Sequence, residues 1–267
     1  MEYWTDVIKR MKYAQSKGCT TVMLTGSNEP QQNRRWLESL YLAMQTLPEP
    51  FTNIEIQTTG ALLDEDYLRF LKDFGVTTVA VSTFNIFDDV TNREIEECAD
   101  KTLNLETLCN TITKLGMNLR LCINVTDYVT PFGNRIYDRR DIKNYEGSAA
   151  FEDVCAILNG CAQLGANQVT FRKMWSAPGT PEAEWIKAHG RIADFILASV
   201  KTAVETNGTL INVLPYGAAR YDYKGFSIVI DTDSMAKDEN NMATKYYIIR
   251  ENGKMYSSWD SAASIVF

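Results

Sequence analysis

The sequence predicts an α/β protein built as a partial parallel barrel, with a small antiparallel β-hairpin near its C-terminal end. Strand-like and helix-like segments alternate up to about residue 215, which is typical of parallel strands joined by crossover helices. Six strands can be counted there, and a closed eight-stranded barrel of this type is typically longer. From residue 224 the pattern turns β-rich around Asn252-Gly253, a strong hairpin signal. We therefore expect a barrel domain over 1–223 and an appendage over 224–267.

Each element follows from a local pattern. Apolar and β-branched runs predict strands, here at 20–25, 53–58, 76–82, 118–125, 168–174 and 209–214. Helical spacing, with glycines such as Gly75 after the ends and Pro181 in a first turn, predicts helices between them. These lie at 3–16, 34–46, 64–74, 93–115 as one or two helices, 151–164 and 181–205. The segment 127–148 is predicted as a long loop, equally open to a role as a solvated linker or at the site.

Composition limits the classes of function. The chain has 267 residues, and 45% of them are hydrophobic, which is enough to bury a core. Its formal net charge of -7 argues against a broad surface for binding nucleic acid. It contains no apolar run of the roughly 20 residues that a membrane span needs. The first residues have no apolar stretch of the signal-peptide kind. We expect a cytoplasmic protein that does not enter a membrane.

The cysteines and the histidine give little indication of a metal site or a catalytic site. The six cysteines form neither a CxxC nor a CxxxCxxC motif, which predicts reduced, buried thiols and no metal site. The one histidine, His189, makes multi-histidine metal sites and Ser/His/Asp schemes a poor fit, and we expect it on the surface of a helix. The sequence identifies no catalytic residue.

The first polar motif follows the first strand, at Gly26-Ser27-Asn28-Glu29-Pro30. A glycine after a parallel strand lets the backbone approach a ligand, and Glu29 could accept a hydrogen bond from an ammonium group. On the next strand, Glu55 and Gln57 share one face by parity. For Thr58, at the end of that strand, a role in the turn is favoured over ligand contact.

Later strands add basic and amide side chains. Arg120, Cys122 and Asn124 share one face by strand parity, and Arg172 lies on the following strand. An arginine facing a barrel interior needs an anion there. Lys173 could act as a Schiff-base nucleophile, although an exposed lysine is favoured.

By order and spacing, the segments 23–30, 54–60 and 79–84 resemble the second, third and fourth strands of the radical S-adenosylmethionine (SAM) enzymes. The insertion of Ser27-Asn28 departs from the Gly-Gly-Glu motif of that family. Ser82 resembles the serine on the fourth strand that contacts SAM. The resemblance implies that SAM is the cofactor, bound by residues on the ends of the strands. These are Gly26, Ser27, Asn28, Glu29, Thr58, Ser82, Arg120, Asn124 and Arg172.

In that family three cysteines hold a [4Fe–4S] cluster on a loop that would precede Met1. The resemblance therefore implies a cluster only if an upstream cysteine motif exists, or if a partner chain supplies the missing segment. The full-length form would cleave SAM reductively to start radical chemistry on an unknown small-molecule or peptide substrate. This chain alone would be a truncated or cluster-free form, inactive by itself. The alternatives are a degenerate barrel acting as a non-catalytic binding or scaffold protein, and a barrel lyase using Lys173.

Overall fold

The computed structural model describes residues 2–26, 28–96, 104–130, 148–214, 217–232, 246–259 and 261–267. Its main feature is an eight-stranded sheet in the order β1-β2-β3-β4-β5-β8-β7-β6, with β1 and β6 at the two edges. The strands are β1 (Thr21–Leu24), β2 (Asn53–Thr58), β3 (Thr78–Thr83), β4 (Asn118–Val125), β5 (Gln168–Lys173), β6 (Thr209–Val213), β7 (Ala219–Tyr223) and β8 (Phe226–Asp231). The prediction of an α/β partial barrel is confirmed.

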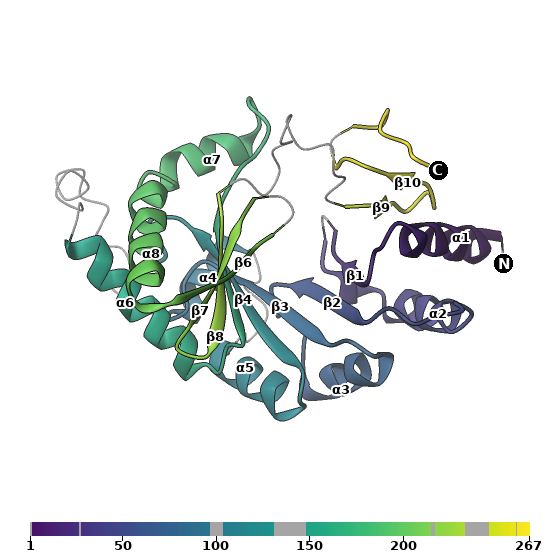
Figure 1. Cartoon of the computed structure of the whole chain (residues 1–267), viewed down its shortest axis with the longest axis horizontal. Helices are drawn as coiled ribbons and strands as arrows, with labels where there is room; N and C mark the ends of the chain where they lie inside the picture. The colour runs from purple at the N-terminus through teal and green to yellow at the C-terminus, as the bar shows by residue number, and fades with distance from the viewer. Residues whose placement is uncertain are drawn as a thin grey trace.

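Helices cover the outside of the curved sheet (Figure 1). They are α1 (Glu2–Ser16), α2 (Arg34–Met44), α3 (Glu65–Phe74), α4 (Asp89–Ile95), α5 (Leu105–Lys114), α6 (Ser148–Gln163), α7 (Pro181–His189) and α8 (Ala193–Asn207), with a short 3-10 helix at Pro30–Gln32. Buried aliphatic side chains of the strands and helices form one continuous core between the two layers. The region predicted as one or two helices at 93–115 contains α4 and α5, and α4 begins earlier, after its cap Asp88.

The end of the main sheet differs from the prediction. Six strands are parallel as expected, but the sixth is β8, which pairs in parallel with β5. The segment predicted as the sixth parallel strand is β6, which lies at the far edge and pairs antiparallel with β7. We had expected β8 to belong to the C-terminal appendage, and that placement was wrong. The division into domains at residue 224 is otherwise untested and stays a prediction.

A two-residue turn explains how β8 reaches this position. Lys224 and Gly225 both have positive φ values, 51° and 94°, and Tyr223 faces Phe226 across the turn. Two consecutive residues with positive φ match the type I′ turn that joins tight hairpins. The hairpin therefore returns the chain into the main sheet, with Phe226 and Ile228 buried in the core.

The predicted long helix 181–205 is divided into α7 and α8. Gly190 caps α7, and a Cβ at this position would lie 2.7 Å from the carbonyl oxygen of Ile186. Residues 190–192 separate the two helices. Helical spacing continued across this break, so the periodicity alone did not reveal it.

The C-terminal hairpin forms as predicted, from β9 (Ile248–Ile249) and β10 (Met255–Tyr256). The Gly253 amide donates to the Arg250 carbonyl at 2.8 Å, and Gly253 has a φ of 73°. The segment packs on α1, where the ring of Phe267 stacks on Tyr13 with 5.3 Å between centroids. Among the described residues, no helix has the length and apolar character needed to cross a membrane.

Candidate functional site

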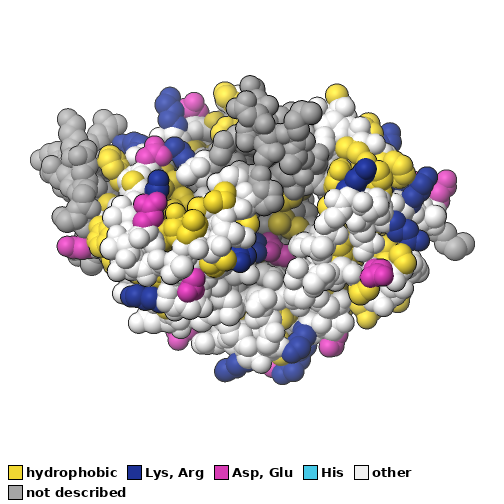
Figure 2. Space-filling model, viewed as in Figure 1, with side chains coloured by type: hydrophobic (Ala, Val, Ile, Leu, Met, Phe, Trp, Pro, Cys, Tyr) yellow, Lys and Arg dark blue, Asp and Glu magenta, His cyan; other side chains and the backbone are white. Residues whose placement is uncertain are grey.

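The two faces of the main sheet have different chemistry. The strand residues that share a face with Ile56 are mostly aliphatic or aromatic and pack under the helices. We call the opposite face the polar face. By pairing register it carries Glu55 and Gln57 on β2, Thr78, Ala80 and Ser82 on β3, Arg120, Cys122 and Asn124 on β4, Gln168, Thr170 and Arg172 on β5, Ser227, Val229 and Asp231 on β8, and Arg220 and Asp222 on β7. In the view of Figure 2, basic and acidic side chains adjoin in a hollow near the centre of the molecule.

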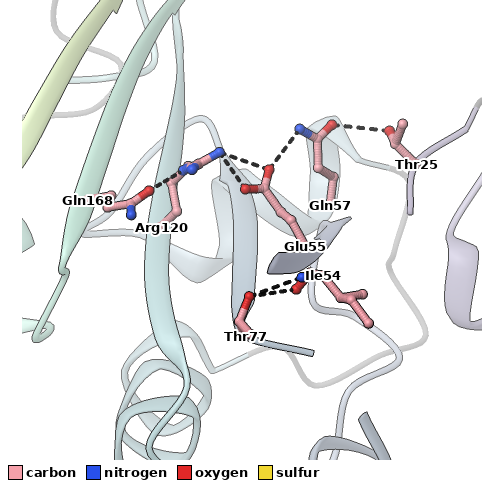
Figure 3. Close-up of polar contacts among 7 residues, drawn as sticks. All are labelled: Thr25, Ile54, Glu55, Gln57, Thr77, Arg120 and Gln168. Carbon is pink, nitrogen blue, oxygen red and sulfur yellow. Dashed lines mark hydrogen bonds and ion pairs between the residues drawn. The ribbon is translucent and has the colours of Figure 1, made fainter. Parts of the chain in front are cut away.

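An ion pair crosses this face from β4 to β2 (Figure 3). Nη1 of Arg120 lies 2.6 Å and 2.8 Å from the two carboxylate oxygens of Glu55. Its Nε donates to Oε1 of Gln168 at 2.7 Å. The strand between them, β3, presents only the methyl group of Ala80 beside Arg120, which leaves the guanidinium room to reach Glu55. We had expected Arg120 to meet the carboxylate of a bound ligand. It has an anion within the protein, and a ligand contact stays a prediction.

The network of hydrogen-bonded polar side chains continues toward β1. Gln57 donates from Nε2 to Oε1 of Glu55 at 3.3 Å and accepts at its own Oε1 from the Thr25 hydroxyl at 3.1 Å. Thr25 directly precedes the motif at Gly26. The network therefore connects the end of β1 to β5 through side chains alone.

Glu29 is held in place by the end of β2. Its Oε1 accepts from the Thr59 amide at 2.7 Å, and its Oε2 accepts from the Thr58 hydroxyl at 2.6 Å. Nε2 of Gln31 also donates to Oε2. An ionised carboxylate can accept about four hydrogen bonds, so these contacts leave one acceptor position, on Oε1. Thr58 acts here by orienting Glu29, as its predicted turn role implies, and its contact with a ligand stays untested.

A second carboxylate lies near Glu29. The side-chain oxygen of Asn92 on α4 accepts from the amides of Phe84 and Asn85, which follow β3, at 2.9 and 3.0 Å. These bonds fix α4, and Glu96 caps its C-terminal end. Burial, together with the charge of Glu29, raises the pKa of Glu96 to about 8. Glu96 is therefore neutral near neutral pH, and Glu29 supplies the negative charge at this end of the face.

Three other predicted residues lie at the C-terminal ends of neighbouring strands. Asn124 pairs in register with Arg172, and Ser82 pairs with Cys122, one step before Asn124. Nε of Arg172 is buried and has no hydrogen-bond acceptor in the described part of the chain. Unlike Arg120, this arginine has a donor available for an anion.

The turn after β1 is described except for Ser27, which lies outside the described residues. Gly26 has room for a side chain, because a Cβ there would meet nothing closer than the Asn28 carbonyl oxygen at 3.7 Å. The fold therefore does not require glycine at this position. Asn28 is exposed. Most of the predicted loop 127–148 also lies outside the described residues.

His189 differs from the expected surface residue. Its Nδ1 lies 3.1 Å from Oδ1 of the buried Asp127. The rings of Tyr128 and Trp185 lie 5.0 and 4.7 Å from its imidazole, centroid to centroid. Burial raises the pKa of Asp127, and His189 opposes that rise. Sequence periodicity placed His189 on a helix but held no signal for the partner from β4.

Lys173 lies on the side of the sheet opposite the polar face. Its ammonium group is 2.6 Å from a carboxylate oxygen of Asp194 on α8, and the side chain is 42% exposed. It therefore does not share a site with Glu29 or Arg172, and the structure offers the Schiff-base alternative no support.

The described cysteines do not fit an iron–sulfur cluster. Cys19, Cys109, Cys122, Cys155 and Cys161 are free thiols, of which only Cys155 and Cys161 share an element, α6, and no group of three or more metal-ligating side chains occurs among the described residues. Cys98 lies outside them. Burial raises the pKa of Cys109 to about 12 and also raises that of Cys161, which disfavours the thiolate form that binds metals.

Comparison with known proteins gives a structural likeness only. No protein-family model and no curated protein match the chain. Among solved structures, it is similar to Streptococcus suis SuiB bound to S-adenosylmethionine, with 14% identity, a TM-score of 0.42, and 66% of this chain and 35% of that chain covered. It is also similar to anSMEcpe with bound AdoMet, with 13% identity, a TM-score of 0.49, and 76% of this chain and 51% of that chain covered. Both structures are similar to this chain in fold alone.

An HMG-CoA lyase from Brucella melitensis is also similar, with 12% identity, a TM-score of 0.40, and 74% of this chain and 60% of that chain covered. At these TM-scores the likeness is one of general α/β architecture. The chain spans between about a third and a half of the length of SuiB and anSMEcpe.

Proposed function

We propose that this chain binds S-adenosylmethionine on the polar face, as the SAM-holding part of a radical SAM-type protein. The observation that carries the proposal is the pair of opposite charges at the strand ends. Glu29 keeps one acceptor position after its three protein contacts, and Arg172 keeps a buried Nε donor. The amino acid part of SAM carries an ammonium and a carboxylate group, which match these two side chains in charge.

The other residues of the site would complete the binding. Ser82 and Asn124 offer a hydroxyl and an amide on the same face as Arg172, suited to polar groups of the ligand. The free backbone at Gly26 allows a ligand to approach the end of β1. In radical SAM chemistry, SAM supplies a carbon radical after one-electron reduction by an iron–sulfur cluster. The described cysteines do not fit that cluster, and the substrate and the radical reaction belong to the proposal for the whole protein.

Calorimetric titration of SAM into the chain tests the proposal. We expect weak binding to the wild type and an affinity at least about ten-fold lower for Glu29→Gln or Arg172→Gln, because a hydrogen bond to a charged group contributes roughly 1.5–3 kcal/mol. Glu38→Gln and Arg34→Gln are matched controls, since these exposed side chains pair with each other on α2. They should leave the affinity unchanged.

Gly26→Ala gives a second test that does not depend on charge. The nearest atom to the new methyl group would be 3.7 Å away, so the melting temperature should stay at the wild-type value. If a ligand lies against this backbone, the affinity for SAM should fall. Tight binding that ignores Glu29 and Arg172 would contradict the proposed site. Undetectable binding to the wild type would favour the non-catalytic scaffold instead.

A further inference from the structure

Arg220 lies on the polar face, at a position that no sequence motif marks. On β7 it pairs in register with Val229 of β8, and Val229 pairs with Thr170 of β5. Thr170 in turn pairs with Cys122 of β4. Arg220 therefore shares a face with Arg172. The two arginines come from strands separated only by β8, about 10 Å apart across the sheet.

The guanidinium of Arg220 is only partly satisfied. Its Nε is buried and has no hydrogen-bond acceptor in the described part of the chain. Arg120, on the same face, shows the opposite condition, because Glu55 and Gln168 accept from it. A buried charged donor without an acceptor is costly, and such groups in native proteins call for an explanation.

The carboxylates on this part of the face do not satisfy this donor. Asp231 on β8 is in register with Arg172 and lies two residues beyond the partner of Arg220, and Asp222 on β7 lies two residues beyond Arg220 itself. Within the described residues, neither arginine forms an ion pair with either carboxylate at 4.0 Å or less. On the other half of the face, Glu55 and Arg120 do form such a pair.

We propose that Arg220 binds an anionic group, a carboxylate or a phosphate, of a second ligand that lies on the polar face beside SAM. The inference rests on the proposed function, because it treats Arg172 as the partner of the SAM carboxylate and so leaves Arg220 for the substrate. The substrate is accordingly an acidic small molecule or an acidic residue of a peptide. The planar fork of arginine suits both carboxylate and phosphate.

The experiment uses succinate and inorganic phosphate as probes of the two chemistries. The Nε–H resonance of Arg220 is identified in a proton–nitrogen spectrum by its loss in Arg220→Lys. We expect one probe to shift this resonance saturably. By calorimetry, Arg220→Gln should bind that probe at least ten-fold more weakly. Arg69→Gln, in an exposed pair with Glu65 on α3, should bind it like the wild type.

The outcomes separate the two proposals. The affinity of Arg220→Gln for SAM should stay within two-fold of the wild type. If SAM fails to bind the wild type, the proposed function falls and with it the substrate assignment, while the two probes still decide whether Arg220 holds an anion. An unshifted Arg220 resonance with both probes, or equal probe affinities of wild type and Arg220→Gln, would overturn the inference. If Arg220→Gln does not fold, the wild-type spectrum and Arg220→Lys decide.

Discussion

Arg120 and Glu55 form an ion pair in which the two partners differ in burial. The Glu55 side chain is 5% exposed and that of Arg120 26%. Removing Arg120 would leave a buried carboxylate without its cation, a change that typically costs 3–5 kcal/mol. Because Arg120 keeps some contact with water, we expect Arg120→Ala to lower the free energy of unfolding by about 3 kcal/mol, measured by urea denaturation.

The exposed pair of Arg34 and Glu38 on α2 provides the control. Both side chains are half exposed, and such pairs contribute about 0–1 kcal/mol. Glu38→Ala should therefore change the free energy of unfolding by less than about 1 kcal/mol. Equal losses for the two variants would mean that the pair across the polar face is no more important than a surface pair.

Glu96 predicts a pH dependence of stability. Its pKa rises from the ordinary 4.5 to about 8 in the folded chain, chiefly because burial disfavours the charged form. Between these values the native state holds a proton that the unfolded state has lost. The free energy of unfolding should therefore fall as pH rises through this window, by up to about 1.4 kcal/mol per pH unit from this one group.

Glu96→Gln should remove that part of the decline, because the amide does not titrate. Urea denaturation between about pH 5 and 8 measures how the free energy of unfolding changes with pH.

The exposed Glu94 on α4 provides the control variant, Glu94→Gln, which should follow the wild-type curve. A wild-type curve that runs parallel to that of Glu96→Gln would contradict the shift. Bound SAM, by placing an ammonium group near Glu29, should lower the pKa of Glu96 and flatten the wild-type curve.

At the level of elements, the alternation of strand-like and helix-like segments, together with the turn residues, was enough to predict most of the sheet. The parity of Ile54, Glu55 and Ile56 correctly separated the core face from the polar face, and Asn252-Gly253 correctly located the C-terminal hairpin. Strand order after β5 was not predictable in the same way. Local pattern identifies β8 as a strand but carries no information on its neighbour, and only the Lys224-Gly225 turn hinted at the hairpin that places it beside β5.

The positions of the candidate site residues in the fold were predicted to a similar degree, while their contact with a ligand stays a prediction. Sequence motifs located Glu29, Ser82, Asn124 and Arg172 at strand ends, where the structure also has them. The pairing of side chains between strands could not be predicted from the sequence, because no local pattern connects Arg120 to Glu55, which lies 65 residues away along the chain. Arg220 was missed for a related reason, since its face is defined by the register of β7 with β8.

The edge strand β6 predicts self-association. It pairs with β7 on one side only within the described sheet, and Leu210, Ile211 and Val213 are 53%, 45% and 58% exposed. An uncharged, apolar edge strand is a template for pairing with another chain. We expect Ile211→Lys to reduce concentration-dependent association, measured by light scattering, with little change in melting temperature.

Leu42→Lys is the matched control for this prediction. Leu42 is 68% exposed, but it lies on helix α2, whose backbone groups are already paired. If both substitutions reduce association equally, general surface hydrophobicity is responsible rather than the open strand edge.

At the scale of the whole molecule, the proposed SAM site and most of the described cysteines lie on opposite sides of the sheet. Arg172 and Asp231 lie at the C-terminal ends of parallel strands of the polar face, where parallel barrels build their sites, whereas Glu55 and Arg120 lie in the N-terminal halves of their strands. Cys122 is the one described cysteine on that face. Cys109 lies in the core under α5, and Cys161 lies there under α6. The proposed binding of SAM therefore does not depend on the cysteines in the core, and it can be measured without a cluster.

We accordingly predict that residues 1–267 alone bind SAM without assembling a [4Fe–4S] cluster. Three thiolates must converge on one cluster, whereas burial raises the pKa of the Cys109, Cys122 and Cys161 thiols, and Cys122 lies on the polar face while the other two lie in the core on the opposite side of the sheet. Anaerobic reconstitution with iron and sulfide, followed by iron analysis and absorption spectra, should leave substoichiometric iron and an unchanged affinity for SAM. About four iron atoms per chain, lost on replacing described cysteines by serine, would contradict this and would mean that the fold rearranges to bring them together.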